Sequence, residues 1–572
     1  NPDRVGLPVL ASLLASLGIT PWRFMFVVPA LAAALLAAAG WAFARAAEEP
    51  PWAAPVFALA LAGSVPFALT TKSYLDNALV DGVIVAAAAG LLFIARDRPA
   101  VVVTALLLGG GILMHWPVGA VFWAIAVLFG VLLIPGPHPA RGDAEPWWTS
   151  RPARVFGAAG AGIVVGGLPL LLTPGANLPD RGTGRFFEGN VERLLPRYRI
   201  PATLAALGLV AVVARRKERG NVLLLLVAWL VPLAVAGMAF LLGASLPLMR
   251  FLGMTLAIPL LLAVLVTSLV GWIARRPPSW WRIVSVTLAA VAAVATIGAT
   301  LLVARDLVRG AVPSVTSAER AVIRPVLGYA DAADATALVV IATKDPGRAF
   351  RRVRMLAPPR LIPRIGVFDG TPEELFGRVA SEDGAAVPPG LTGPELKNAM
   401  ISADAVRLMR DDGAVAVALS PFLDDPLSFA SGPGISTLAD GVFLAQRSGE
   451  RSADVAVVAP PLEEPEPSRL IRDAIVAFLA LCLTGLGWSW ALVPAASDVR
   501  LALAPAIGLA LSLVVGTFLG LQGVALGGGG GVVTLAVVAA SGGVLALWRH
   551  RRTGRSAVRP TEDRAESAGS PR

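Results

Sequence analysis

Two carboxylates lie at the edge of an apolar run that otherwise has the composition of a lipid-soluble helix. Asp76 and Asp81 belong to the stretch "SYLDNALVDGVIVAAAAGLLFIA". A carboxylate can accept a proton from a hydroxyl group, but it is costly to bury in hydrocarbon unless it faces a polar cavity. Asp76 and the adjacent Asn77 could instead cap a helix that begins here, and Asp81 could be a packing residue one turn deeper.

Cationic side chains flank other apolar runs. His115 lies in "GGGILMHWPVGAVF", and Arg250 lies alone in "LPLMRFLGM". A third group belongs to the segment "PDRGTGRFFEGNVERLLPRYRIPA", in which the candidates are Arg185, Arg193, Arg197, Tyr198 and Arg199. Because Arg binds phosphate through two parallel hydrogen bonds, these positions suit a phosphate-bearing substrate. Alternatively, His115 is an interfacial residue and residues 191–198 form an amphipathic interfacial helix.

The elements that position these side chains are apolar helices. The chain has 572 residues, of which 56% are hydrophobic and 15% are charged, whereas a soluble domain carries about 25% charge. The sequence therefore predicts an α-helical polytopic membrane protein with about 13 transmembrane helices. The apolar runs are residues 24–44, 53–70, 78–95, 100–115, 117–134, 155–173, 202–214, 222–243, 251–273, 283–303, 471–493, 501–521 and 531–548.

The charge distribution predicts the orientation of these helices. The net charge is +10, but the basic residues form short clusters beside apolar runs, which is typical of topology signals and not of a nucleic-acid partner. If residue 1 lies outside, the inner loops contain Arg45, Arg96, Arg500 and the cluster 215–219. This orientation predicts a multi-pass plasma-membrane protein with a cytoplasmic C-terminus. The segment 174–201 is basic although it is predicted to lie on the outer side, whereas Lys and Arg usually lie in the inner loops. This exception suggests that its arginines are kept for a function.

Residues 306–468 interrupt the apolar runs. Short β-type runs at 337–343, 364–368, 414–419, 441–445 and 455–459 alternate with helical stretches at 371–380 and 393–409, which predicts an inserted extracytoplasmic α/β domain. Its aspartates, such as Asp345, Asp369 and Asp425, are expected to be turn residues. The expected domains are 1–305 and 469–550 in the membrane, 306–468 outside it, and a disordered basic cytoplasmic tail at 551–572.

Several classes of site are not indicated. The sequence contains one cysteine, Cys482, and three histidines, so it predicts neither an intrachain disulfide nor a histidine-rich metal cluster. It has no P-loop, no dinucleotide-binding glycine motif after a strand, and no HExxH or CxxC motif.

The order of the apolar segments resembles that of GT-C glycosyltransferases, which are polytopic enzymes that use polyprenyl-phosphate sugars. Examples are aminoarabinose and protein O-mannosyl transferases. The resemblance covers mainly residues 5–300 and rests on three stretches: "VGLPVLASLLASLGITPWRFMFVVPALAAALLAAAGWAFARA", then "SYLDNALVDG" followed by "ARDRP" and "LLGGGILMHWPVGAVF", and finally "LPLMRFLGMTLAIPLLL".

The resemblance implies an inverting glycosyltransferase that moves a sugar from a polyprenyl-phosphate carrier to a glycan, lipid or protein acceptor on the outer face of the membrane. Asp76 takes the acidic position, with Asp81 as a second catalytic candidate, and His115 and Arg250 take the phosphate-binding positions. Lys72 and Tyr74, which precede Asp76, join the basic segment as substrate-binding candidates.

The family's principal catalytic acid lies in the first outer loop, ahead of the region that matches the start of this chain. We therefore expect that an N-terminal span and that loop are missing here. No cofactor is implied with certainty. A divalent cation held by Asp76 and a carboxylate of that loop is the one candidate. The composition, rich in Ala, Gly and Arg, predicts a bacterial source, which leaves cell-wall polysaccharide, glycolipid and protein glycosylation open.

Two other functions stay open. A transporter or flippase of lipid-linked glycans would also need charges within the membrane and an outer domain. A transporter typically shows internal repeats, and the two halves of this chain show no convincing repeat. The second of these functions is that of a non-catalytic membrane protein of the same fold.

Overall fold

The structure is a computed structural model of the chain. It describes residues 6–19, 21–64, 66–67, 75–96, 100–134, 149–172, 188–241, 254–274, 283, 287, 317–332, 337–357, 361, 364–391, 393–412, 414–446 and 466–557. Within these ranges the side chains at 75–76 and 188–200, among others, are not described.

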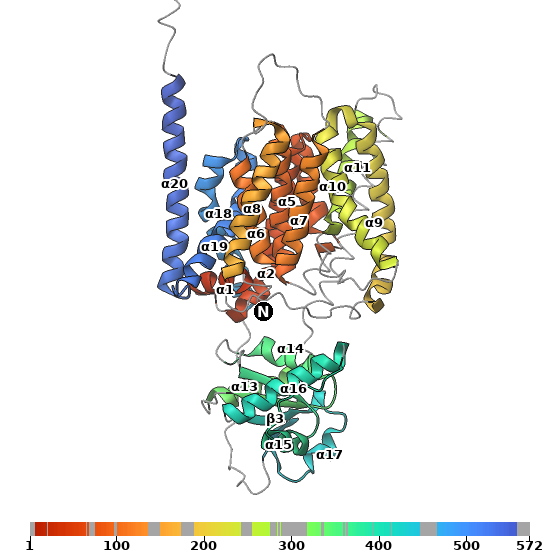
Figure 1. The fold of residues 1–572 in the computed structure, drawn as a ribbon, viewed down its shortest axis with the longest axis vertical. Coiled ribbons are helices and arrows are strands. Elements are labelled where there is room, and N and C mark those ends of the chain that lie inside the picture. The colour runs from red at the N-terminus through yellow and green to blue at the C-terminus, as the bar shows by residue number, and fades with distance from the viewer. Residues whose placement is uncertain are drawn as a thin grey trace, which may run out of the picture.

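Apolar helices form a bundle, and a smaller α/β unit lies between α11 and α18 in the order of the chain (Figure 1). The described helices of the bundle are α1 (Gly6–Ala15), α2 (Pro21–Ala46), α3 (Ala54–Ala62), α5 (Leu75–Ala95), α6 (Val101–Met114), α7 (Trp116–Leu132), α8 (Arg151–Leu172), α9 (Glu188–Ala214), α10 (Arg216–Leu241), α11 (Ala257–Ala274), α18 (Pro467–Leu492), α19 (Ser497–Leu521) and α20 (Gly529–Ala557), with a short 3₁₀ helix η2 (Pro51–Ala53) before α3.

Eight helices in the described part of the chain are long and apolar enough to cross a membrane, which is the architecture of a helical membrane protein. They coincide with eight of the predicted spans. The predicted spans at 53–70, 100–115, 117–134 and 202–214 correspond to shorter apolar helices, and the one at 283–303 lies outside the described residues, apart from two isolated positions. The number of 13 spans therefore stays a prediction.

Helix α5 lies at the centre of the bundle. The whole hydrophobic window of α5 is buried, and its neighbours include α2, α6, α7, α8 and α19. Close packing depends on small residues, because a Cβ atom at Gly82 would lie 2.9 Å from the Cβ atom of Leu35 in α2, and one at Gly90 would lie 2.3 Å from Oγ1 of Thr104 in α6. Small residues of this kind let membrane helices approach each other.

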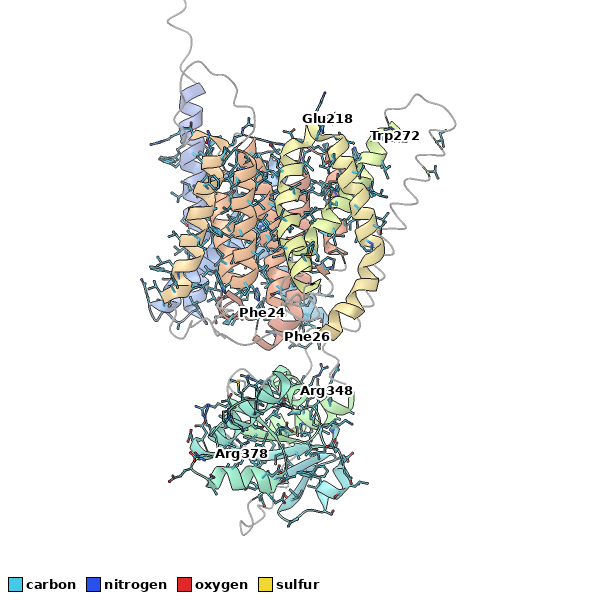
Figure 2. All side chains as sticks on the ribbon, turned by 45° about the vertical axis from the view of Figure 1, so that its right-hand side comes forward. Phe24, Phe26, Glu218, Trp272, Arg348 and Arg378 are labelled. Carbon is cyan, nitrogen blue, oxygen red and sulfur yellow. The ribbon has the colours of Figure 1, made fainter. Side chains whose placement is uncertain are left out.

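The bundle has two ends, which we name after residues located there. The Glu49 end contains the α2–η2 connection and the start of α10, and the His115 end contains the α6–α7 junction and the start of α5. Figure 2 shows Glu218 and Trp272 at the first end, and Phe24 and Phe26 at the second. The loops that the sequence predicts to be inside meet at the Glu49 end, since Arg45 contacts Asp498 and Arg96 contacts Glu48.

The α/β unit contains a five-stranded sheet with the order β2-β1-β3-β5-β4. Strands β1 (Leu338–Ala342), β2 (Ile365–Asp369) and β3 (Val415–Leu419) are parallel, and β5 (Val442–Ala445) and β4 (Ile435–Ala439) add antiparallel to one edge. Four of the five predicted strands are found. The fifth, at 455–459, lies outside the described residues, and β4 was not predicted.

Helices cover both faces of this sheet. One face packs under α13 (Ser317–Ala332) and α14 (Pro346–Leu356), through residues such as Ile323, Val340 and Val353. The other packs under α15 (Pro372–Ala380) and α16 (Gly393–Asp411), through residues such as Val339 and Val406. A short helix, α17 (Pro426–Ala430), precedes β4. Successive side chains of β1 point to opposite faces of the sheet, so its apolar residues are divided between these two cores.

Candidate functional site

Helix α5 places two polar side chains on one face at the His115 end. Asn77 and Asp81 are four residues apart, so they lie one above the other on the helix surface. Both are fully buried. Asp81 therefore faces neither lipid nor solvent in the described structure. Asp76 occupies the first turn of the helix, as the sequence predicts, but its side chain is not described.

His115 lies between two helices. It is the only residue between the end of α6 at Met114 and the start of α7 at Trp116, and its backbone is extended. Its N–H donates to the carbonyl of Gly111 at 3.1 Å, and its own carbonyl accepts from the N–H of Gly119 at 3.0 Å. A tight turn thus separates α6 from α7, and it buries the imidazole, which is 1% exposed. The sequence left open whether His115 is an interfacial residue or a phosphate-binding one, and both stay predictions.

Helices α5 and α6 pack against each other in antiparallel directions. Gly90, late in α5, packs on Thr104, which lies early in α6. Gly111, late in α6, lies instead beside the early part of α5. A Cβ atom at Gly111 would be 3.7 Å from Cγ2 of Val80 and 3.9 Å from Cγ1 of Val83. The end of α6 is therefore beside the start of α5.

This packing brings three polar residues to one level. His115 lies one turn beyond Gly111. It therefore falls level with the turn of α5 that carries Asn77 and Asp81. We name Asn77, Asp81 and His115 the buried polar cluster.

Asn77 is the member of the buried polar cluster whose hydrogen bonding is least complete. Neither its Oδ1 nor its Nδ2 atom has a hydrogen-bond partner among the described residues. Leaving a buried polar group unsatisfied costs about 1–3 kcal/mol, so native proteins satisfy such groups with water or a ligand, or keep them for a functional reason. An amide both donates and accepts, which matches the hydroxyl groups of a sugar. From the sequence Asn77 is predicted only as a cap, although its spacing of four residues from Asp81 is a signal for a shared helix face.

The remaining predicted site residues are not brought to the cluster by any described contact. Lys72, Tyr74, Arg185 and Arg250 lie outside the described residues. Helix α9 contains Arg193, Arg197, Tyr198 and Arg199, and their side chains are not described.

The basic segment 174–201 is helical from Glu188 onward, without a break to Ala214. This agrees with a helix at 191–198, which the sequence offers as one alternative, and residues 174–187 lie outside the described residues. The short apolar run at 202–214 is the second half of this 27-residue helix. The sequence did not join the two parts, because the first half is mainly polar and includes two prolines, Pro196 and Pro201.

An ion pair that the sequence did not suggest lies at the same end of the bundle. Nη1 of Arg23, near the start of α2, lies 2.6 Å from Oδ2 of Asp473, near the start of α18. Asp473 is buried. The two residues are 450 positions apart in the chain, so hydropathy and local spacing carried no signal for their contact. The pair joins the first and last parts of the bundle beside the α/β unit.

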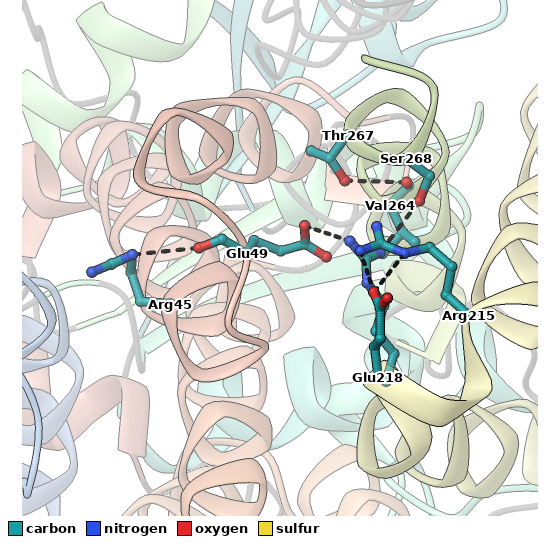
Figure 3. Close-up of polar contacts among 8 residues, drawn as sticks. Arg45, Glu49, Arg215, Glu218, Val264, Thr267 and Ser268 are labelled. Carbon is teal, nitrogen blue, oxygen red and sulfur yellow. Dashed lines mark hydrogen bonds and ion pairs between the residues drawn. The ribbon is translucent and has the colours of Figure 1, made fainter. Parts of the chain in front are cut away.

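A second polar group lies at the Glu49 end (Figure 3). Nη2 of Arg219 lies 2.7 Å from Oε2 of Glu49, and both side chains are buried. Nη1 of Arg219 also donates to Oγ of Ser268 in α11 at 3.3 Å. Arg219 interrupts the regular helix of α10, with φ −120° and ψ 27°, which allows its side chain to reach the α2–η2 connection.

Burial raises the pKa of Glu49 above its ordinary value of 4.5, and the nearby guanidinium of Arg219 partly offsets this rise. The carboxylate lies outside the spanning helices, next to a fixed cation and a set of hydroxyl groups. This arrangement ties α2, α10 and α11 together. Because its ion pair and hydrogen bonds join three helices, we assign it a structural role.

The turn residues of the α/β unit behave as predicted. Asp345 caps α14 by accepting from the N–H of Arg348, and Asp425 caps α17 by accepting from that of Ser428. Asp369 ends β2 and accepts a hydrogen bond from Nδ2 of Asn398 at 3.1 Å. Burial raises the pKa of Asp369. These aspartates serve local structure.

Among the described residues, no three side chains of His, Cys, Asp or Glu are grouped to hold a metal ion. In comparisons with family models, with curated proteins and with solved structures, none matches the chain. The candidate site therefore rests on the geometry of the buried polar cluster.

Proposed function

We propose that this protein is an integral membrane glycosyltransferase. It moves a sugar from a polyprenyl-phosphate carrier to a glycan, lipid or protein acceptor, on the side of the plasma membrane to which the His115 end and the extracytoplasmic α/β unit belong. The observation that carries the proposal is the burial of Asn77, Asp81 and His115 at one level of the central helices. An ionisable side chain buried within a membrane bundle is expensive and is typically kept for function.

The proposed reaction assigns each residue a step. The carboxylate of Asp81, with Asp76 as the second acidic candidate, takes the proton from an acceptor hydroxyl. The acceptor oxygen then attacks the anomeric carbon with inversion, and the bond between that carbon and the phosphate oxygen breaks. His115 and the arginines of α9, with Arg250, neutralise the departing carrier phosphate. The amide of Asn77 holds a sugar hydroxyl. The resemblance of residues 5–300 to GT-C glycosyltransferases gives the acidic position to Asp76 and the phosphate-binding positions to His115 and Arg250.

The test replaces Asp81 by Asn in the full chain, reconstituted in nanodiscs with undecaprenyl-phosphate monosaccharides and a membrane extract as acceptor. A general base contributes about 10²- to 10⁴-fold, so transfer should fall at least 100-fold. The matched control is Asp498→Asn, which removes a carboxylate of the Glu49 end that pairs with Arg45. Transfer by this control should equal that of the parent.

Two outcomes would contradict the proposal. One is transfer by Asp81→Asn within threefold of the parent, and the other is an absence of transfer by the parent from every donor tested. In the second case, movement of the intact carrier between leaflets would point to a transporter. Thermal unfolding of both variants shows whether a loss of transfer reflects a loss of fold.

A further inference from the structure

The two helical layers of the α/β unit carry different charges. Helices α13 and α14 together contain six arginines and two acidic residues. Helices α15 and α16, on the opposite face of the sheet, contain four basic and five acidic residues. The unit is therefore strongly basic on one face and close to neutral on the other.

The fold presents the arginines of α14 away from the sheet. Ala349, Val353 and Leu356 are buried in the core under this helix, and their spacing of four and three residues defines one face. The helix has an arginine at positions 348, 351, 352 and 354 and contains no acidic residue. At 100° per residue these positions fall outside the buried face, so the outer surface of α14 is cationic.

An ion pair joins α13 and α14 into one layer. Nε of Arg348 lies 2.8 Å from Oε1 of Glu319, whose side chain is 1% exposed. The pair neutralises Arg348, so the net positive charge of the layer comes from its other arginines. Arg320 and Arg324 of α13 are partly exposed, and they extend the cationic surface from α14 across α13.

This layer lies on the side of the α/β unit that faces the bundle. Figure 1 shows α14 at that side, and Figure 2, turned by 45°, shows Arg348 there as well. The length of the connecting segment is compatible with this placement. Residues 304–316 separate the predicted apolar run at 283–303 from α13, and they span at most about 45 Å when fully extended. The cationic surface therefore faces the end of the bundle from which the α/β unit is connected, and it can reach the lipid headgroups there.

We propose that the layer formed by α13 and α14 binds the surface of a bilayer that contains anionic phospholipid. Each arginine near such a surface strengthens binding by about fivefold, and the attraction falls off within a Debye length. The proposal is independent of the sugar-transfer function, because it concerns only where the α/β unit rests. Charge complementarity selects the lipid surface as the partner.

The test measures how well the layer is shielded from water in the full chain. A cysteine reporter replaces Ala321, which is exposed on α13, after Cys482, the only cysteine, is changed to Ser. A dye on the reporter is exposed to an aqueous quencher, in nanodiscs of phosphatidylcholine alone and in nanodiscs that also contain phosphatidylglycerol. Quenching should be weak only with phosphatidylglycerol, and high salt should restore it.

Paired variants assign the effect to the basic layer. Arg324→Gln with Arg352→Gln should weaken docking on the order of 30-fold, whereas Arg324→Lys with Arg352→Lys should keep it. Lys397→Gln with Arg407→Gln removes two cations from the opposite layer and should change nothing. Equal quenching in the two lipids would overturn the proposal, because it would mean that the layer packs on the bundle itself or stays in water. Equal docking by the two glutamine pairs would overturn it as well.

Discussion

At the Glu49 end of the bundle, buried charges touch charges of opposite sign, whereas at the His115 end the buried amide of Asn77 touches no polar partner among the described residues. Glu49 forms an ion pair with Arg219. Two further ion pairs at this end, which are less buried, join Arg45 to Asp498 and Arg96 to Glu48. The His115 end has ion pairs too, in which Arg23 and Arg472 both contact the buried Asp473. Satisfied polar groups fix a structure, while unsatisfied ones are available to a ligand. The Glu49 end also has one buried atom without a hydrogen-bond partner, Oε1 of Glu49, so the two ends differ in charge pairing: Glu49 has a buried cation as its partner, and the amide of Asn77 has no polar partner among the described residues.

The largest effect on stability is expected from Arg219→Ala. It leaves Glu49 buried without its cation, and breaking a buried ion pair in this way costs about 3–5 kcal/mol. Thermal unfolding in detergent measures the change. Arg407→Ala, which breaks an exposed pair with Asp404 in α16, should cost less than about 1 kcal/mol. Equal losses in the two variants would remove the distinction between a buried pair and a surface pair.

Replacing an asparagine by leucine should have opposite effects at the two ends. Asn77→Leu removes an unsatisfied buried amide and should stabilise the protein by about 1–3 kcal/mol, if the leucine fits. The same change at Asn221, whose Nδ2 donates to the carbonyl of Ala95 at 3.2 Å near the Glu49 end, should destabilise it by about 1 kcal/mol. Sugar transfer should fall only in Asn77→Leu. A destabilised Asn77→Leu with normal transfer would make Asn77 a structural residue.

A smaller change tests the packing that positions His115. A Cβ atom at Gly119 would lie 2.5 Å from Cα of Ile112, so Gly119→Ala must separate α6 from α7. Overpacking of this kind costs about 1–3 kcal/mol. The control is Gly157→Ala in α8, where a Cβ atom would meet nothing within 4 Å. That variant should be neutral or slightly more stable, because alanine favours the helix by up to about 1 kcal/mol.

The pH dependence of stability gives the smallest expected effect. Since burial raises the pKa of Glu49 in the folded state, the folded state binds the proton more tightly than the unfolded state. The resulting stabilisation is present in full below the ordinary value of 4.5 and is lost as the pH rises through the folded pKa. Unfolding curves recorded from pH 4 upward, on the order of one pH unit apart, should show this decline. Glu49→Gln should abolish it, and Arg219→Ala should enlarge it.

Local patterns predicted much of the fold. Runs of apolar residues located the eight long helices, and short apolar β-type runs located β1, β2, β3 and β5, because a strand covered on both faces is apolar at successive positions. The same reasoning missed α1, which is short, and found only residues 191–198 as a possible helix in the polar first half of α9. It also missed β4, whose residues are only partly buried.

The candidate site was predictable only in part. Asp81 and His115 were visible because an ionisable residue is rare in an apolar run. Their level in the bundle was not visible, since it follows from the way glycines pack α5 on α6. The pairs Arg219–Glu49 and Arg23–Asp473 join residues 170 and 450 positions apart. Such contacts depend on tertiary structure, which spacing along the chain does not encode.

The complete burial of α5 limits how a long-tailed substrate can approach Asp81. The neighbouring helices cover the whole apolar window of α5, so an isoprenoid chain that slid in sideways from the bilayer core would have to part them. In the proposed reaction the carrier would instead approach along the membrane surface at the His115 end, where α5 begins, although Asn77, Asp81 and His115 are buried there as well. A carrier lipid would then keep its tail among the lipids, outside the ring of helices, and present only its head to the interior. The depth of Asp81 below that entrance would set how much of the head can be admitted.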